Sequence, residues 1–499
     1  MSEPKPSKEN TVPQEFAEYL EQVCQQIRWK KAHPSIRREL SNHMEDQMGE
    51  YLSVGIPPEE AARKTVKEMG DPVQIGTQFD RSYRPKVDKG ILLATGLLLV
   101  IGYIIQSFFY LQSPVLSLSR WDMPAAVVIG VCGMLAAVKI DYTALAMNRK
   151  TSIVVYTIYN AVIFILPLLY RFIAQNSSYY LLFSAAIHLS LLFPLVFCGI
   201  VYSFRGWGFP GFLVCGAMAT VSLFLMLLNR FTATLITIIP TLAVMVMAVK
   251  LDWFGFFSKM KKSAAYVCIF APVTIFVCTI LIRYAGRIFA VIINPSIDAR
   301  DKGYIYIVIR SVLKSSKWIG RVDLAATPFG DLPLNEILPH DPDLLLTWTI
   351  ATLGWWTLFI IIPLALLICL KGLHICLRQS GSLGKMVSCA AVFTLAAQFA
   401  CFIQANLGIV FIVPFPFPFL QGNRSIIVNL ILLGFLLSVG QRKGLDEPSS
   451  SQEDLFDKKS PVSLSVKRTG QEIDVSLKVR LPDTQKDSGE ADSSPINSH

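Results

Sequence analysis

Charged side chains are scarce in this sequence of 499 residues: Asp, Glu, Lys and Arg make up 16% of it, whereas 53% of the residues are hydrophobic. Soluble proteins carry charge on about a quarter of their residues, so the shortage argues against a water-soluble fold. The apolar residues are gathered in runs of about twenty, the length at which a helix crosses about 30 Å of hydrocarbon. The composition therefore predicts an integral membrane protein.

The sequence also lacks the common signatures of catalytic and metal sites. It contains no spaced set of metal ligands, no glycine-rich phosphate loop and no recognisable Ser-His-Asp arrangement. None of the ten cysteines lies in the longest predicted outer loop, which excludes an oxidised extracellular framework there. His188 is a lone histidine in an apolar run, and we expect it to pack or to form hydrogen bonds.

Ten apolar runs predict an all-α, polytopic membrane protein with about ten transmembrane helices and a small cytosolic helical bundle. The runs are Gly90–Gln112, Pro124–Met147, Ser152–Ala174, Tyr179–Tyr202, Phe209–Leu228, Phe231–Val249, Ala264–Ile282, Leu344–Leu370, Met386–Val413 and Ser425–Gly440.

Lys and Arg residues predict the orientation of these helices. With the N-terminus inside, the short inner loops hold eleven Lys and Arg residues and the short outer loops hold four, in agreement with the positive-inside rule. Both termini are then cytosolic, and residues 283–343 form one long outer loop. The net charge of +10 suits contact with anionic membrane lipid and requires no nucleic-acid partner.

The polar ends of the chain predict two further parts. Residues 1–89 have helical apolar periodicity, with Phe16, Leu20, Val23 and Ile27 on one face and Asp71-Pro72 as a helix start. Residues 90–440 form the membrane domain. Residues 441–499 form a polar, mostly disordered tail, in which alternating apolar residues around Thr469-Gly470 are consistent with one hairpin.

The long outer loop contains the stretch GYIYIVIRSVLKSSKWIGR, which predicts a helix lying in the membrane interface. Such a helix either rests on lipid or offers its cations to a substrate. We therefore treat its four cations as candidate substrate-binding residues: Arg310, Lys314, Lys317 and Arg321.

Polar residues at the outer helix ends complete the candidate site. Asp343 stands immediately before the eighth run, where an aspartate is either an ordinary helix cap or a partly desolvated general base. Gln404 and Asn406 end the ninth run, and Ser425 begins the tenth. Amides at membrane depth are costly unless they face partners or a cavity, so these three are candidate substrate-binding residues.

The last two runs, ANLGIVFIVPFPFPFLQGNRSIIVNLILLGFLLSVG, resemble the C-terminal signature of the FtsW/RodA/SpoVE (SEDS) family. The outer loop also fits, with Leu338-Pro339 before Asp343 and Gly354 eleven residues after it. The chain departs from the family where Ala351-Thr352 replaces an acidic pair. The matching residues, in order, are Asn406, Gly408, Pro414, Pro418-Phe419, Ser425, Asn429, Gly434 and Ser438.

A second resemblance concerns residues 13–85. The stretch IRRELSNHMEDQMGEYLSVGIPPEEAARKTVKEMGDPVQIG is similar to the small helical permease-prefix domain that precedes bacterial membrane proteins.

The SEDS resemblance implies polymerisation of undecaprenyl-pyrophosphate-linked lipid II at the outer face of the bacterial cytoplasmic membrane, in division, cell shape or sporulation. Asp343 would be the general base or would position the acceptor, with loop cations or a divalent cation stabilising the pyrophosphate. The implied partner is a class B penicillin-binding protein, which is a transpeptidase. Two alternatives stay open: a non-catalytic scaffold that recruits cell-wall enzymes, and a flippase for the lipid-linked precursor.

Overall fold

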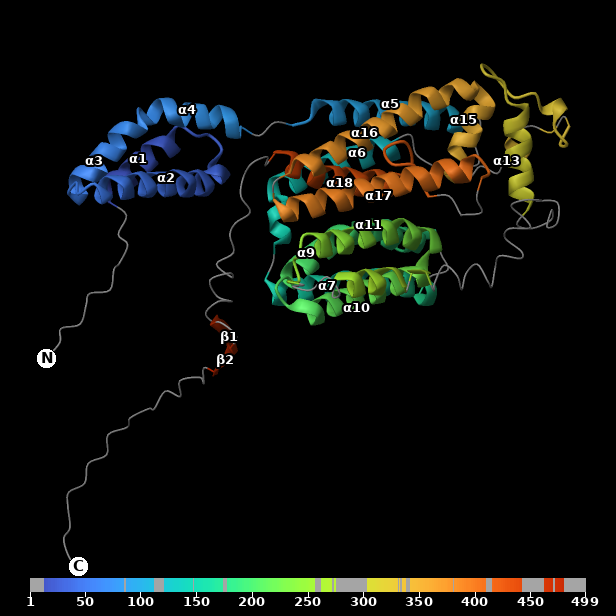
Figure 1. Cartoon of the computed structure of the whole chain (residues 1–499). Coiled ribbons are helices and arrows are strands. Elements are labelled where there is room, and N and C mark those ends of the chain that lie inside the picture. The colour runs from blue at the N-terminus through green and yellow to red at the C-terminus, as the bar shows by residue number, and fades with distance from the viewer. Residues whose placement is uncertain are drawn as a thin grey trace, which may run out of the picture. The chain divides into compact units, whose positions relative to one another are not determined.

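The structure is a computed structural model. It describes residues 13–84, 87–111, 121–146, 148–173, 177–255, 262–271, 273–274, 303–330, 332, 334–337, 342–379, 381–409, 415–441, 462–469 and 472–479 (Figure 1). The chain divides into two compact units, residues 1–445 and 446–499.

The N-terminal part is a bundle of four helices, α1 (Gln14–Gln25), α2 (His33–Ser53), α3 (Pro58–Met69) and α4 (Pro72–Tyr83). Its core contains the four apolar residues predicted from the periodicity of α1, including Phe16 and Val23, which are fully buried. The predicted helix start is also confirmed, because the Asp71 carboxylate accepts the N–H of Val73 at 3.1 Å.

Helices α1 and α4 run in parallel, so the bundle has two distinct ends. The Tyr19 hydroxyl donates to the carbonyl of Met69, just before α4, and the N–H of Arg28 donates to Asp80 in the last turn of α4. Between them, Gly76 permits close contact, since a Cβ there would lie 2.7 Å from the Val23 carbonyl. We call the end at which α1 and α4 finish, and from which the chain continues to the membrane, the exit end.

The membrane part confirms the predicted polytopic helical fold. Within the described ranges, nine segments are long and apolar enough to cross a membrane, with α8 and α9 joined into one segment through the 3₁₀ turn η3 (Ser190–Leu192). Of the seventh predicted run, an apolar helix over Lys262–Ala271 is described, and most of the remainder lies outside the described residues. The long helices are α5 (Lys89–Leu111), α6 (Asp122–Ile140), α7 (Arg149–Ile173), α8 (Ser177–Leu189), α9 (Phe193–Ser203), α10 (Gly208–Asn229), α11 (Phe231–Lys250), α16 (Leu358–Arg378), α17 (Ser382–Asn406) and α18 (Asn423–Gln441).

Helices α6 and α18 pack closely because glycines lie between them. A Cβ at Gly434 would lie 2.6 Å from the Met134 carbonyl oxygen, the kind of close approach that small residues permit in membranes. The second predicted run extends too far: α6 ends at Ile140, because Asp141 has a φ of 80° and accepts the Ser438 hydroxyl at 2.9 Å.

The sequence predicts one continuous helix for the eighth run, and the structure shows that this prediction is wrong. The run consists of α15 (Leu345–Leu353), a break at Gly354 with a φ of 106°, the 3₁₀ turn η7 (Trp355–Thr357) and α16. Backbone groups at the break pair with the outer loop, including the N–H of Gly320 with the Leu353 carbonyl and that of Val322 with the Ala351 carbonyl. These bonds satisfy the irregular backbone where a continuous helix is lost.

The predicted interfacial helix is α13 (Tyr304–Ser315), which ends before the last part of the predicted stretch. It runs across the end of the helix bundle (Figure 1) and buries Val308, Ile309 and Val312 in the main apolar core. It therefore packs on protein instead of resting only on lipid.

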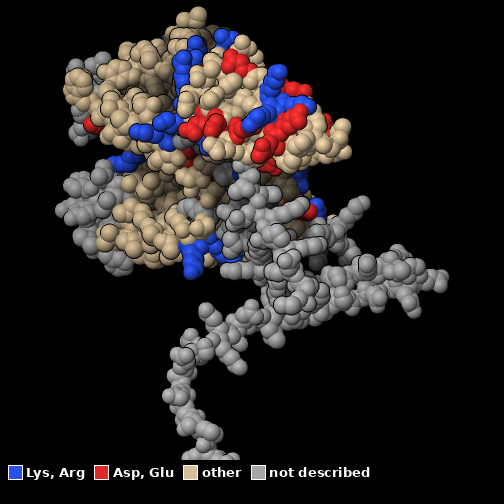
Figure 2. All heavy atoms as spheres, turned by 90° about the vertical axis from the view of Figure 1, so that its left-hand side faces the viewer, with Lys and Arg blue, Asp and Glu red and all other residues tan. Residues whose placement is uncertain are grey.

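On the face shown in Figure 2, most of the charged side chains lie in one region, and the remainder of the described surface of this face is mainly uncharged. The second unit contains the predicted hairpin, formed by antiparallel strands β1 (Val462–Thr469) and β2 (Glu472–Val479). The predicted disorder at the ends of the tail concerns residues outside the described ranges.

Candidate active site

The candidate site lies at the end of the membrane bundle opposite to the start of α5. Helices α10 and α11 meet there in a tight turn at Arg230, and α15 begins there two residues after Asp343, which belongs to the 3₁₀ turn η6 (Pro342–Leu344). Successive spans alternate in direction, so this is the end at which α5 finishes and α18 starts. The fold thus brings together two residues that are 113 positions apart.

Asp343 and Arg230 form an ion pair. Nη2 of Arg230 lies 3.3 Å from Oδ2 of Asp343, and the side chains are 26% and 18% exposed, respectively. Both charges are therefore partly removed from water. In such a position an ion pair is stronger than at an open surface, and either charge is costly to leave without its partner. Because a guanidinium has five N–H donors, Arg230 can hold Asp343 and still face an anion.

Asn406, the last residue of α17, fixes the start of α15. Its side-chain oxygen accepts the N–H of Thr347 at 3.0 Å, and its amide group donates to the backbone carbonyls of Asp343 at 3.0 Å and Phe402 at 3.1 Å. The Thr347 hydroxyl donates to the Asn406 carbonyl. Asn406 is fully buried, so this candidate substrate-binding residue instead positions the backbone that carries Asp343.

An aromatic residue lies beside the ion pair. The Arg230 guanidinium carbon is 5.9 Å from the centroid of the buried Phe415 ring, and the His188 ring is 5.3 Å from the same ring. Nδ1 of His188 is 2.7 Å from the Ser184 carbonyl oxygen. His188 therefore packs and forms a hydrogen bond, as the sequence predicted for a lone histidine.

The four cations predicted for the outer loop do not converge on Asp343 through any described contact. Nε of Arg310 donates to the Gly408 carbonyl at 3.1 Å and so caps the end of α17. The other three side chains are exposed: Lys314, Lys317 and Arg321. Their role in substrate binding stays a prediction.

Ser425 and Gln404 make no described contact with Asp343 or Arg230. Ser425 is buried and accepts from the Asn429 amide at 3.0 Å, and Asn429 exchanges two hydrogen bonds with Gln398. This polar cluster joins α17 to α18 inside the bundle. Gln404 is half-buried on the last turn of α17, and its proposed contact with substrate remains untested.

Sequence reasoning missed Arg230 as a site residue. It was counted only as one of the four cations in short outer loops, because nothing in the sequence relates the turn between α10 and α11 to the start of α15. The available signal was its position: an arginine in a one-residue connection between two apolar helices is held at the membrane edge.

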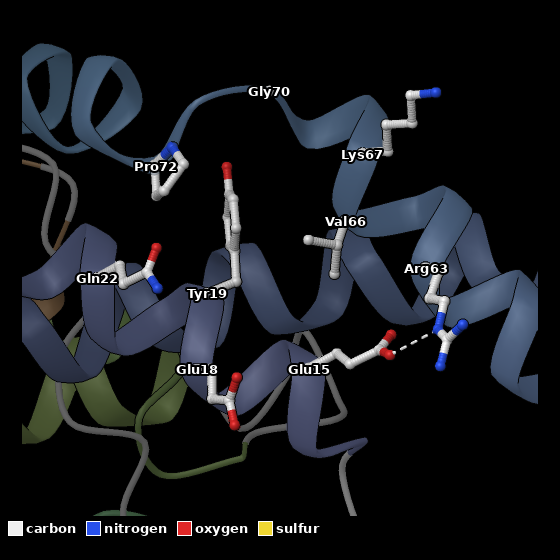
Figure 3. A pocket seen from close by; sticks show the side chains of 9 residues that line it. All are labelled: Glu15, Glu18, Tyr19, Gln22, Arg63, Val66, Lys67, Gly70 and Pro72. Carbon is white, nitrogen blue, oxygen red and sulfur yellow. Dashed lines mark hydrogen bonds and ion pairs between the residues drawn. The ribbon is translucent and has the colours of Figure 1, made fainter.

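The N-terminal bundle has a groove with a volume of about 360 Å³ (Figure 3). Tyr19 rises from α1 to the turn at Gly70, Val66 points toward it from α3, and Glu15 bonds Arg63 at 3.1 Å. Burial, and then the charge of Asp71, raise the pKa of the Tyr19 hydroxyl above its ordinary value. The groove is lined by two acidic residues, Glu15 and Glu18, and two basic ones, Arg63 and Lys67, so its charge selects no ligand class.

Metal-binding groups of at least three His, Cys, Asp or Glu residues are absent from the ranges that the structure describes. The groups described at the candidate site are the Asp343 carboxylate, the Arg230 guanidinium and backbone groups.

Comparison with known proteins supports the fold. No family model and no curated protein sequence matches the chain. Among solved structures, it is similar to a chain from a peptidoglycan synthase complex, described in terms of the coordination of polymerization and crosslinking. The sequences are 16% identical, the match covers 72% of this chain and 99% of that chain, and the TM-score is 0.50.

Two structures of the rod shape determining protein RodA of Thermus thermophilus, one of them a mutant, are also similar. Each is 12% identical, with 72% of this chain and 98% of that chain covered and a TM-score of 0.44. The protein is a multi-pass helical membrane protein, and the comparison with the synthase complex shows that it shares the fold of that chain. The resemblance seen in the sequence is confirmed at the level of the fold.

Proposed function

We propose that this chain is a SEDS-type glycosyltransferase that polymerises lipid II at the outer face of the bacterial cytoplasmic membrane. The observation that carries the proposal is the position of Asp343: a carboxylate 18% exposed, at the start of the broken eighth span, paired with Arg230 and located at the bundle end opposite to the start of α5. The sequence motifs around Asp343 and in the last two spans support the same assignment.

In the proposed reaction, the 4-hydroxyl of the acceptor sugar attacks the anomeric carbon of the donor. A C–O bond forms there, the bond from that carbon to the pyrophosphate oxygen breaks, and undecaprenyl pyrophosphate leaves with the electron pair. The proton of the attacking hydroxyl passes to the Asp343 carboxylate, which acts as general base. Arg230 orients the carboxylate before attack and stabilises negative charge on the leaving group.

A second candidate function is a non-catalytic scaffold that recruits a transpeptidase. The Arg230–Asp343 pair is the observation that favours it, since an ion pair of this kind can have a purely structural role, in which it holds α15 against the turn between α10 and α11. In both cases we propose that the termini are cytosolic, as the Lys and Arg distribution predicts.

Purified protein in proteoliposomes with fluorescent lipid II separates these functions, in the presence and absence of a class B penicillin-binding protein. The glycosyltransferase makes glycan polymer from lipid II. A scaffold makes none but co-purifies with the transpeptidase, and a flippase moves labelled lipid II between leaflets without polymer. Absence of polymer in both arms, with intact protein, would refute the proposed enzyme.

A further inference from the structure

The N-terminal bundle has an uneven distribution of charge. At the exit end, the last turn of α4 contacts the end of α1 and the start of α2: Asp80 pairs with Arg28, and the Tyr83 hydroxyl donates to Glu39 at 3.1 Å. Nε of Arg37 lies 3.4 Å from the sulfur of Cys24 in the last turn of α1. The basic residues gathered here are Arg28, Lys30, Arg37, Arg38, Arg81 and Arg84, and all six are exposed.

Acidic residues neutralise this cluster only in part. Glu39 and Asp80 are the acidic residues that contact this cluster, so its six named cations exceed them by four charges. The second half of α2 and the first turn of α3 carry the opposite charge, with exposed side chains of Glu45, Asp46, Glu50, Glu59 and Glu60. The bundle is therefore polarised, although its overall charge is small.

The covalent chain keeps the exit end close to the membrane. The helix α4 ends at Tyr83, and the first candidate span begins at Lys89. Five residues separate them, so the exit end lies within roughly 20 Å of the membrane edge even if these residues are fully extended. The junction is fixed on the membrane side by Asp88, whose carboxylate accepts the N–H of Gly90 at 2.9 Å and lies 3.4 Å from Nζ of Lys371.

We propose that the exit end is a docking surface for anionic phospholipid headgroups of the leaflet next to which the bundle is tethered. Exposed cations near an anionic leaflet are attracted by its surface potential. Each cation raises the equilibrium constant for attachment to the leaflet about fivefold. The acidic half of α2 is repelled by the same surface, so charge alone orients the bundle. This inference does not depend on the proposed enzymatic activity.

Docking in this orientation has one structural consequence. Because α1 and α4 run in parallel, the groove at Tyr19 and Gly70 lies at the end away from the exit end (Figure 3). The groove is then directed to the aqueous phase, while the exposed side chain of Lys30, in the turn between α1 and α2, faces the lipid.

Hydrogen exchange of the full-length protein in nanodiscs tests the proposal. The readout is exchange of the amides in residues 26–32, measured with phosphatidylglycerol-containing discs and with phosphatidylcholine discs. We expect slower exchange in the anionic discs and loss of this protection at high salt, where surface electrostatics are screened. Arg81→Gln/Arg84→Gln is expected to weaken the attachment by about 25-fold and so to remove the protection.

The matched control is Lys64→Gln/Lys67→Gln, which removes the same two charges from α3 and should leave the protection unchanged. Exchange in phosphatidylcholine discs shows whether each variant still folds, since the core amides of the bundle must keep the parental rates. Equal exchange of residues 26–32 in both lipids overturns the proposal. Protection that is the same in detergent as in anionic discs also overturns it, because the exit end would then contact protein.

Discussion

At the scale of single residues, the position of Asp343 depends on the hydrogen bonds of Asn406. Asn406→Ala removes the acceptor of the Thr347 N–H, which is buried, and the donor to the Asp343 carbonyl, which is partly buried. Leaving such groups without partners costs about 1–3 kcal/mol each. We expect a clearly lower thermal unfolding temperature in detergent, and Gln404→Ala, a half-buried residue of the same helix end, serves as the control. Equal temperatures for the two variants would contradict the role of Asn406.

At the scale of elements, the break in the eighth span is the feature most open to test. Gly354 has a φ of 106°, and a Cβ there would overlap the carbonyl oxygen of Trp318 in the outer loop. Gly354→Ala should therefore destabilise the protein by about 2 kcal/mol or more and release the loop from α15. The measurement is limited proteolysis at residues 316–323. Gly96→Ala, in α5 with open space around it, should change neither cleavage nor stability.

The start of α5 gives a prediction about pH. Burial would raise the pKa of the Asp88 carboxyl, but the N–H of Ile91, the charge of Lys371 and the N–H of Gly90 together hold this pKa below its ordinary value. A folded-state pKa that is depressed contributes stability above the unfolded value near pH 4, and this contribution is lost as the pH falls below that value.

Thermal unfolding of the parent and Asp88→Asn across this pH range measures the contribution. Above about pH 5 the parent should be more stable by roughly 0.5–1 kcal/mol, a small value because both partners are partly exposed. The difference should shrink toward pH 3. A difference that stays constant with pH would show that the charge of Asp88 is not responsible.

The sequence predicted elements better than it predicted how they are interrupted. Apolar runs located the spans because length and hydropathy are local properties, and Asp71-Pro72 located α4 for the same reason. The break at Gly354 depends on an outer loop more than thirty residues away that bonds to the irregular backbone. The early end of α6 depends on Ser438, nearly three hundred residues later in the chain. Such partners are invisible to local patterns.

The candidate site was predictable only in part, for a similar reason. Asp343 was found from its motif, and counting spans predicted its position at the end of the bundle where α5 finishes. Its partner Arg230 was not found, because an ion pair across 113 positions has no signal in one sequence. Arg310 was assigned to substrate from its charge, whereas the fold uses its guanidinium to cap α17. Charge indicates which residues can bind an anion, but packing decides which remain available.

At the scale of the whole molecule, the chain shares its fold with a chain of a peptidoglycan synthase complex, and the proposed sugar transfer depends on the carboxylate of Asp343, which is paired with Arg230. The same ion pair could also have a structural role, and the two roles differ in what a charge exchange does. Asp343→Arg with Arg230→Asp restores an ion pair of opposite polarity, so it preserves the contact between α15 and the turn before α11 but removes the base at position 343.

The most direct test is lipid II polymerisation by Asp343→Asn, with Asp323→Asn, an exposed aspartate of the same outer loop, as the matched control. We predict that Asp343→Asn loses at least about a hundredfold in rate, the scale of general-base catalysis, while the protein still folds. Asp323→Asn should polymerise at the parental rate. Full activity in Asp343→Asn would contradict the assignment of this carboxylate as the base.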